Sequence, residues 1–510
     1  MKNLLKSLLF ITFSLSYFVC TSFTEKLPLK NKKNVQPPNI LFFLVDDMGW
    51  MDTSINGSTY YETPNMERLA KMGMTFTHAY AANPLCSPTR ASILTGQDPA
   101  RIRLTTPSGH LAPNPNKLLE ASKGSAWQKV ATPASKTYLP TAQFTIAEAL
   151  KENSYTTAHI GKWHLGQKGY WPENHGFDIN IGGQQHPGPP SYFSPYKIAN
   201  LPNGEKNEYI TDRVTKETVK FLKNQPKNKP FLLNVWQYGV HAPYQAPKAL
   251  IEKYASKKDS RGKQSNPIMG AMMEKVDESL GIIMDELIAQ NMMDNTIIIF
   301  FSDNGGNMYD VVNGSFPTNN YPLSYGKGNI HEGGIRVPCI VYWKDKVEPN
   351  SSSNDMIQST DFYPTILDMT NTSKNPKQKL DGVSLVKLLT KQKPLKRKAI
   401  FSHFPHYVAA TSNYPTTAVW YKNYKLLKVY GEGVNRTPEF KLYNLKEDIS
   451  ETNNIANSHP KLVNKLKPML NDYLENIDAL VPIKNPNYKP NSTSRFGIAP
   501  RFPIERYPSY

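Results

Sequence analysis

Three largely apolar runs constrain the fold of this 510-residue chain more than any other feature of its sequence. They are Asn39–Val45, Pro230–Trp236 and Thr296–Phe301. A strand that is apolar on both sides is expected where both faces of a sheet are covered. Segments with helical spacing, such as residues 211–224 and 271–290, separate the runs. Strands that alternate with helices predict an α/β fold, with a large mixed, mostly parallel sheet sandwiched by helices.

The pattern changes near residue 398, where short strands replace the longer runs and a helix over residues 459–477 follows. This predicts a smaller C-terminal α+β subdomain, an antiparallel sheet plus a helix, over residues 396–480. The large domain then spans residues 39–395. Residues 481–510 form a basic tail rich in proline and aromatic residues, either extended over the body or mobile.

The N-terminus carries the features of an export signal. Basic residues precede an apolar run, Leu8–Val19, that is too short to span a bilayer comfortably. Residues 1–22 are therefore predicted to be a signal peptide and residues 23–38 a linker, which makes the protein periplasmic or secreted, with no transmembrane segment. Lipid anchoring through Cys20 is the alternative, disfavoured because the bulky residues before it make a poor lipobox.

Acidic residues follow two of the apolar runs. Asp46 and Asp47 come directly after the first run, and Asp303 and Asn304 follow the third. Adjacent carboxylates repel each other unless a cation lies between them. Open α/β sheets bind ligands in the crevice beyond the carboxyl ends of their strands. Either aspartate alone could cap a turn, but the pair favours a metal site.

Basic residues occupy similar positions. Lys162 and His164 are two residues apart, so in an extended segment they project to one side. The alternative is a strand end with two exposed polar residues. His241 follows the second apolar run, where a lone histidine is usually structural. Lys327 lies between two glycines, so it can approach an anion closely.

Cys86 and Arg90 enclose a short motif, Cys-x-Pro-x-Arg, just before an apolar helical run. Pro88 suits the first turn of a helix, where a missing N–H costs nothing. Cys86 would then lie near the helix N-terminus, where free N–H groups and the helix dipole favour an anion. Arg90 could return to the same face. The alternative is a half-buried structural cysteine.

The Cys-x-Pro-x-Arg motif over residues 86–90, followed by Ser-x-x-Thr-Gly over residues 92–96, resembles the signature of the type I sulfatases. These are the formylglycine-dependent members of the alkaline phosphatase superfamily. The resemblance runs in motif order from about Asn39 to Asn454. Residues 442–445 with Asp448 are similar to the family's carboxyl-terminal signature. Several motifs in the right order are specific, where any one alone is not.

This resemblance implies an enzyme, a sulfuric ester hydrolase, whose cysteine is converted after translation to formylglycine (3-oxoalanine). Here that residue is Cys86, and a formylglycine-generating maturation enzyme is the implied partner. The family's metal ligands fall on Asp46, Asp47, Asp303 and Asn304, together with the modified Cys86. All-oxygen, mostly anionic ligands suit a hard ion, and Ca²⁺ better than zinc, so one Ca²⁺ per chain is expected.

The resemblance also implies a ring of catalytic side chains around the sulfate, namely Arg90, Lys162, His164, His241 and Lys327. As a hypothesis, the hydrated aldehyde at residue 86 attacks sulfur, and His241 with Lys327 protonates the leaving oxygen. His164 then removes the proton that allows sulfate to leave. Fixed cations stabilise the charge that grows on the bridging oxygen.

The formal net charge of +18 indicates a polyanionic partner. Nucleic acid, acidic lipid and sulfated polysaccharide all qualify on charge, but no nucleic-acid-binding module accompanies it. An ordinary solvated basic surface is the alternative. With export, the charge favours a sulfated polysaccharide or its oligosaccharides, for example a marine algal glycan such as ulvan. His186 in the loop over residues 182–195, and His403 and His406 from the subdomain, are candidate substrate contacts.

Two other functions stay open at this point. The first is a phosphodiesterase or phosphonate hydrolase of the same superfamily. The second is an unmatured, inactive protein that binds anionic glycans.

Overall fold

The computed structural model describes residues 36–114, 119–310, 312 and 314–492. The chain divides into two units, Met1–Gln36 and Pro37–Tyr510, and all described helices and strands belong to the second. The predicted signal peptide with Cys20, most of the predicted linker, and residues 493–510 of the predicted tail lie outside the described residues. Among the residues that are described, no helix combines the length and apolar composition needed to cross a membrane.

A mixed sheet of eight strands, in the order β10-β2-β9-β8-β1-β7-β5-β6, forms the centre of the second unit. β9 is antiparallel to both of its neighbours and all other adjacent pairs are parallel. The strands are β1 (Asn39–Val45), β2 (Met74–Phe76), β5 (Thr156–Gly161), β6 (Ile179–Ile181), β7 (Phe231–Trp236), β8 (Thr296–Ser302), β9 (Cys339–Tyr342) and β10 (Ser351–Ser353). The predicted mixed, mostly parallel sheet is confirmed, and the three apolar runs are its adjacent strands β7, β1 and β8.

Successive residues of β1 enter two different cores, which is why residues 40–45 are all apolar. Leu41, Phe43 and Val45 pack into one core, while Ile40 and Phe42 pack into the other. All residues of β1 are buried. A strand with helices on both faces has no position left for a solvated side chain.

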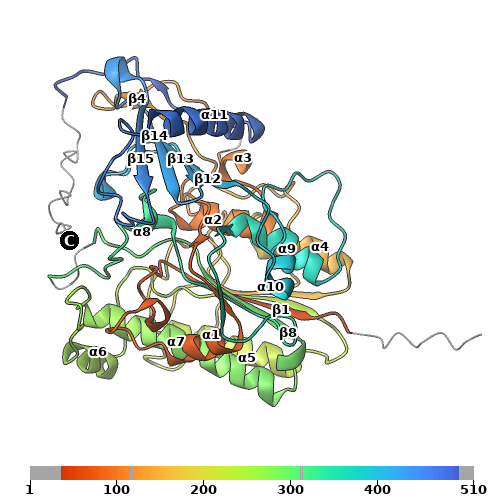
Figure 1. The fold of residues 1–510 in the computed structure, drawn as a ribbon. Coiled ribbons are helices and arrows are strands. Elements are labelled where there is room, and N and C mark those ends of the chain that lie inside the picture. The colour runs from red at the N-terminus through yellow and green to blue at the C-terminus, as the bar shows by residue number, and fades with distance from the viewer. Residues whose placement is uncertain (1–35, 115–118, 311, 313, 493–510) are drawn as a thin grey trace, which may run out of the picture. The chain divides into compact units, whose positions relative to one another are not determined.

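Helices cover both faces of this sheet (Figure 1). One layer contains α1 (Pro64–Met72), α5 (Ile210–Asn224), α6 (Lys248–Ala255) and α7 (Pro267–Ala289). The other contains α2 (Cys86–Thr95), α3 (Pro99–Ile102), α4 (Ile146–Glu152), α9 (Phe362–Met369) and α10 (Val386–Lys391). The methionines of α7 belong to the first core, so they have a packing role.

A second, antiparallel sheet follows in the C-terminal part. It contains β12 (Ala399–Phe404), β13 (Thr416–Tyr421), β14 (Tyr424–Val429) and β15 (Glu439–Asn444), in that order. The helix α11 (Pro460–Asn476) packs on one face of it through Val463 and Leu466 against Leu426. The other face packs against α8 (Glu332–Ile335) through Trp420. The predicted antiparallel sheet plus helix is therefore confirmed.

Two short strand pairs complete the structure. β3 (Ala79–Tyr80) pairs with β11 (Ile357–Gln358), and β4 (Val130–Ala131) pairs with β16 (Ile483–Lys484). The second pair ties the beginning of the predicted tail to the polar segment that follows α3.

Candidate active site

The carboxyl ends of β1 and β8 carry an acidic cluster. The two strands pair in parallel and in register up to their last residues, so Asp46 and Asp303 follow at the same edge of the sheet. Both aspartates are fully buried. Asp47 lies in the left-handed region, with φ of 62°, and its N–H donates to Asp303 Oδ1 at 3.2 Å. Asp46, Asp303 and Cys86 each offer one atom, and these atoms lie within 4.8 Å of one another.

Two buried oxygen atoms of this cluster, Asp46 Oδ1 and Asn304 Oδ1, have no hydrogen-bond partner among the described residues. Such atoms are costly and need an explanation. The Nδ2 group of Asn304 donates to Asp47 Oδ1 at 2.8 Å, so its amide oxygen is the atom left over. Carboxylate and amide oxygens are the usual ligands of hard cations such as Ca²⁺. The side chains present therefore fit a divalent cation.

The pKa shifts of the three aspartates also favour a divalent cation at this site. Burial raises the pKa of Asp46, and burial together with the nearby Asp46 raises the pKa of Asp303 to about 6. Burial acts on Asp47 too, but Lys327 and His241 hold its pKa below the usual range. A divalent cation among these carboxylates would favour their charged forms.

Cys86 is the first residue of α2, and its Sγ atom is buried beside the acidic cluster. Burial raises the pKa of the Cys86 thiol, so as an unmodified residue it is a poor thiolate. One turn along the helix, Arg90 donates from Nε to Asp303 Oδ2 at 2.8 Å and from Nη1 to the carbonyl of Lys162 at 2.9 Å. The predicted return of Arg90 to the face of Cys86 thus brings a fully buried cation to the cluster.

Each of the two consecutive aspartates has its own lysine. Lys162 Nζ lies 2.5 Å from Asp46 Oδ2, and Lys327 Nζ lies 2.7 Å from Asp47 Oδ2. His241 donates from Nδ1 to the carbonyl of Ala242 at 2.7 Å, and its Nε2 faces Asp47 Oδ2 at 3.8 Å. Burial and the nearby lysines lower the pKa of His241 to about 3. The two lysines and His241 therefore lie around the same cluster.

His164 links residue 86 to a residue that the sequence did not single out. Its Nδ1 lies 3.4 Å from Cys86 Sγ, and its Nε2 lies 3.3 Å from Nδ1 of His110. His110 belongs to the polar segment after α3, which carries no periodic pattern. The sequence feature next to His110 that could have indicated this contact is Gly109. A Cβ atom at residue 109 would lie 2.1 Å from the carbonyl oxygen of His164. Only glycine lets the two segments approach this closely.

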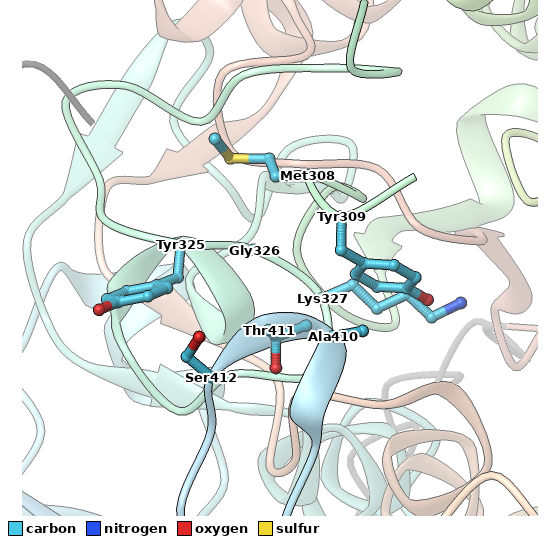
Figure 2. A pocket seen from close by; sticks show the side chains of 8 residues that line it. All are labelled: Met308, Tyr309, Tyr325, Gly326, Lys327, Ala410, Thr411 and Ser412. Carbon is cyan, nitrogen blue, oxygen red and sulfur yellow. The ribbon is translucent and has the colours of Figure 1, made fainter. Parts of the chain in front are cut away.

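A small pocket lies beside Lys327. Figure 2 shows Tyr309 and Lys327 on one side of it and Tyr325 and Ser412 on the other. The remaining lining residues are Met308, Gly326, Ala410 and Thr411. Residues 410–412 belong to the connection between β12 and β13 in the C-terminal subdomain. Thr411 Oγ1 donates to the carbonyl of Gly328 at 2.8 Å. The subdomain thus forms part of the wall next to a predicted catalytic lysine.

The three predicted substrate histidines lie in different surroundings. His186 is half-buried in its loop, and Gly188 of the same loop lies against the ring of His241. His403 is buried, with Nδ1 2.7 Å from Thr417 Oγ1 and Nε2 3.0 Å from the carbonyl of Leu480. The ring of His406 likewise bonds to a threonine hydroxyl, with Nε2 2.8 Å from Thr105 Oγ1. These bonds are structural, and contact of the three histidines with substrate stays a prediction.

The fold and site together define a hydrolase for esters of a tetrahedral oxyanion. The acidic cluster fits a cation, and buried Arg90, Lys162 and Lys327 fit an anionic group next to residue 86. Comparison with known proteins narrows this class. Residues 38–372 match the family described as "Sulfatase", and residues 323–478 match "N-sulphoglucosamine sulphohydrolase, C-terminal". The chain belongs to the sulfatase family of the alkaline phosphatase superfamily and is an enzyme that hydrolyses sulfate esters.

Individual relatives agree with this membership. The chain is 30% identical over 516 residues to a sulfatase of Formosa agariphila, covering 85% of this chain and 89% of that protein. It is 31% identical over 405 residues to N-acetylgalactosamine-6-sulfatase of Homo sapiens, covering 76% and 72%. A solved structure described as "Crystal structure of Ps i-CgsB in complex with k-i-k-neocarrahexaose" has a TM-score of 0.69 and 27% identity, covering 86% of this chain and 93% of that one.

Proposed function

We propose that this sulfatase removes sulfate from a sulfated polysaccharide or its oligosaccharides, using formylglycine made from Cys86 and one Ca²⁺. The ligands of Ca²⁺ would be Asp46, Asp47, Asp303, Asn304 and the modified residue 86. The observation that carries the proposal is the meeting of distant segments around Cys86. Asp47 and Lys327, whose charged groups lie 2.7 Å apart, are separated by 280 residues in the chain.

When present, formylglycine supplies a hydrated aldehyde as nucleophile, and Ca²⁺ acts as a Lewis acid toward the sulfate oxygens. The side chains of this protein bind and orient the ester. Arg90 and Lys162 are fully buried, so their positive charges act in a water-poor site where they stabilise a sulfate group most strongly. Lys327, whose ammonium lies beside Asp47, is the third cation around the sulfate group.

The two histidines are suited to proton transfer. His164 Nδ1 lies 3.4 Å from Cys86 Sγ, the atom that stands where the formylglycine oxygens would be, so it can accept a proton there. His241 uses Nδ1–H for the carbonyl of Ala242, which leaves Nε2 to deliver a proton to the leaving alcohol. A bound sulfate ester adds negative charge near His241 and favours its protonated form.

Three observations support a carbohydrate substrate. The net charge of +18 suits a polyanion. One relative is named N-acetylgalactosamine-6-sulfatase, and a solved relative holds a hexaose. A marine algal glycan such as ulvan is our specific proposal. We also propose export to the periplasm or the exterior, supported by the basic and apolar pattern of residues 1–22.

The test combines chemistry at residue 86 with a substrate panel. Mass spectrometry of the Cys86 peptide from the native host should detect the aldehyde, and Cys86→Ala should lower kcat by at least about 10,000-fold. Sulfated oligosaccharides should be desulfated faster than matched phosphate mono- and diesters are cleaved. Ordinary activity in Cys86→Ala contradicts the proposal. Faster diester cleavage indicates a phosphodiesterase, and retention on sulfated resin without aldehyde or turnover indicates an inactive binder.

A further inference from the structure

A second cavity, of about 620 Å³, lies at the junction of the two sheets. Its walls come from the β3 segment, from the connections that flank β11 and precede β12, and from the turns after β13 and β15. Cavities of about 300–1,000 Å³ at domain junctions commonly bind ligands. Its lining residues are Thr77, His78, Tyr80, Arg336, Asn354, Asp355, Met356, Leu395, Arg397, Trp420, Lys422, Asn423, Leu445, Lys446 and Ile449. None of them belongs to the acidic cluster or to its ring of cations.

The charge of this lining is mostly positive, with Arg336, Arg397, Lys422 and Lys446 against the single carboxylate of Asp355. The carboxylate is already occupied. Its Oδ1 accepts from the backbone N–H of Leu395 at 3.0 Å, and its Oδ2 accepts from a serine hydroxyl at 3.2 Å. The cavity therefore presents four cations and one carboxylate whose two oxygens already accept hydrogen bonds.

The four cations divide into two arginines that form ion pairs and two lysines that form none among the described residues; the ammonium of Lys422 lies 5.8 Å from the centre of the Tyr421 ring. Arg397 pairs with both carboxylate oxygens of Asp361, and Arg336 lies 3.6 Å from Glu332. The Nε atom of Arg397 is nevertheless buried without a hydrogen-bond partner among the residues that the structure describes. Lys422 and Lys446 are exposed, and neither forms an ion pair within the described part of the chain. The two lysines supply the charge that is available to a ligand.

The turns that carry these lysines are held together. The backbone N–H of Leu445 donates to the carbonyl of Asn423 at 2.7 Å. Lys422 and Lys446, the neighbours of these two residues, therefore lie on adjacent parts of one rim. Two lysines placed side by side on these turns suit singly charged sulfate groups, because an ammonium acts as a point charge and needs no bidentate geometry.

The aromatic residues argue against a nucleic acid in this cavity. Tyr80 and Trp420 are 0% and 1% exposed, and both bond to Glu332 through their polar atoms. Neither ring is available for base stacking, which single-stranded nucleic acids require. Exposed polar groups such as Asn423 suit the hydroxyl groups of a sugar.

We propose that this cavity is a second, non-catalytic binding site for a sulfate-bearing sugar unit of a polymeric substrate, with Lys422 and Lys446 as its sulfate contacts. The proposal rests on the substrate class proposed above. Occupation of this site would hold the enzyme on the polymer while another sulfate ester occupies the active site.

The test uses the full-length protein with two lysines reversed, Lys422→Glu with Lys446→Glu. Its affinity for dextran sulfate should fall about tenfold, or about 1.4 kcal/mol, since two attractive contacts are replaced by repulsion. The value of kcat/KM on 4-nitrophenyl sulfate should stay within about twofold of the unsubstituted protein. The milder pair Lys422→Gln with Lys446→Gln should give an intermediate loss of affinity.

The matched control reverses two exposed lysines elsewhere, Lys220→Glu on α5 with Lys258→Glu in the connection after α6, and neither lysine is in an ion pair within the described residues. The control should keep its affinity for dextran sulfate within about twofold. Equal losses in both variants, or an equal loss of affinity for polyglutamate, overturn the second site. Absence of activity on any sulfate ester in the unsubstituted protein refutes the proposed function instead, so the two failures are distinguishable.

Discussion

The acidic cluster at the ends of β1 and β8 and the ion network around Glu332 both bury several charges. The cluster is open in the sense that ligand atoms of Asp46, Asp303 and Cys86 converge within 4.8 Å, whereas the network is closed in the sense that its carboxylates lie around the ammonium of Lys425. Lys425 lies 3.2 Å from Glu332 and 2.7 Å from Glu451, and all three side chains are buried. Glu332 also accepts from the Trp420 indole at 2.7 Å and from the Tyr80 hydroxyl at 2.9 Å. The acidic cluster, by contrast, brings carboxylate oxygens and the sulfur of Cys86 together as a set of potential metal ligands.

This difference separates a structural role from a functional one. A junction between two sheets needs every buried charge matched, because one unmatched charge is strongly destabilising. A binding site needs unmatched groups, because they are what the ligand satisfies. Burial of charge does not by itself identify a functional site in this molecule. Ligand atoms of several residues that converge within 4.8 Å do, and the following changes test that distinction.

The largest effect is expected in the open cluster. Asp303→Asn keeps the size of the side chain but removes one ligand charge and the closest ionic partner of Arg90. We expect kcat to fall about 10,000-fold, or roughly 5.5 kcal/mol of transition-state stabilisation. Urea unfolding should change by no more than about 1.5 kcal/mol, because Arg90 keeps Asp46 at 3.7 Å and the carbonyl of Lys162, and because the change removes the repulsion from Asp46 that, with burial, raises the pKa of Asp303 to about 6. A rate within tenfold of the unsubstituted enzyme would remove the cluster from the active site.

The closed network should respond in the opposite way. Glu332→Ala leaves Lys425 buried with Glu451 as its remaining carboxylate, and it removes the acceptor of Trp420 and Tyr80. The free energy of unfolding should fall by about 4 kcal/mol, measured in urea, while kcat of the folded fraction stays within about tenfold. Glu62→Ala is the control, because the side chain of Glu62 is 44% exposed and its ion pairs, with Lys253 and Lys257, lie near the surface. It should cost less than about 1 kcal/mol. Equal losses in the two variants would contradict the comparison.

Metal addition and removal should sharpen the difference further. Ca²⁺ at 100 times its Kd should raise the free energy of unfolding by about 2.7 kcal/mol, and a chelator should reverse the gain. The Glu332→Ala variant should keep this response, since the network contributes no ligand. Asp303→Asn should lose most of it. A full Ca²⁺ response in Asp303→Asn, measured by urea unfolding, would mean that the cation binds elsewhere.

The open cluster was more accessible to prediction than the closed network. Asp46, Asp47 and Asp303 directly follow strands whose apolar character fixes them at the centre of a parallel sheet, so their position at one edge follows from the sequence pattern. The pairing of Lys425 with Glu332 joins residues 93 apart with no pattern between them. Which carboxylate pairs with Lys425 depends on how the antiparallel sheet packs against α8, and local sequence spacing does not determine this packing.

The same reason explains the two residues that sequence analysis missed in the site. His110 lies in a polar segment without periodicity, 54 residues before His164. Tyr309 follows the third strand but belongs to an irregular connection, so no register relates it to Lys327. Side chains brought by loops depend on tertiary contacts, whereas those at strand ends inherit the geometry of the sheet.

The smallest expected effect concerns His406, which joins the subdomain to the segment after α3. Its Nε2 bonds to Thr105 Oγ1 at 2.8 Å, and burial lowers its pKa from 6.5 to about 3. The folded protein therefore keeps His406 neutral, while the unfolded chain binds a proton below pH 6.5. This contribution to stability is present above pH 6.5 and is lost as the pH falls toward about 3.

From pH 7.5 to 5.5 the unsubstituted protein should lose about 1.3 kcal/mol more than His406→Gln, measured by urea unfolding at each pH. His459→Gln, at an exposed position, should follow the unsubstituted protein. If His406→Gln were as acid-sensitive as the unsubstituted protein, His406 would take up its proton equally well in the folded and unfolded states, and burial at this junction would not keep it neutral.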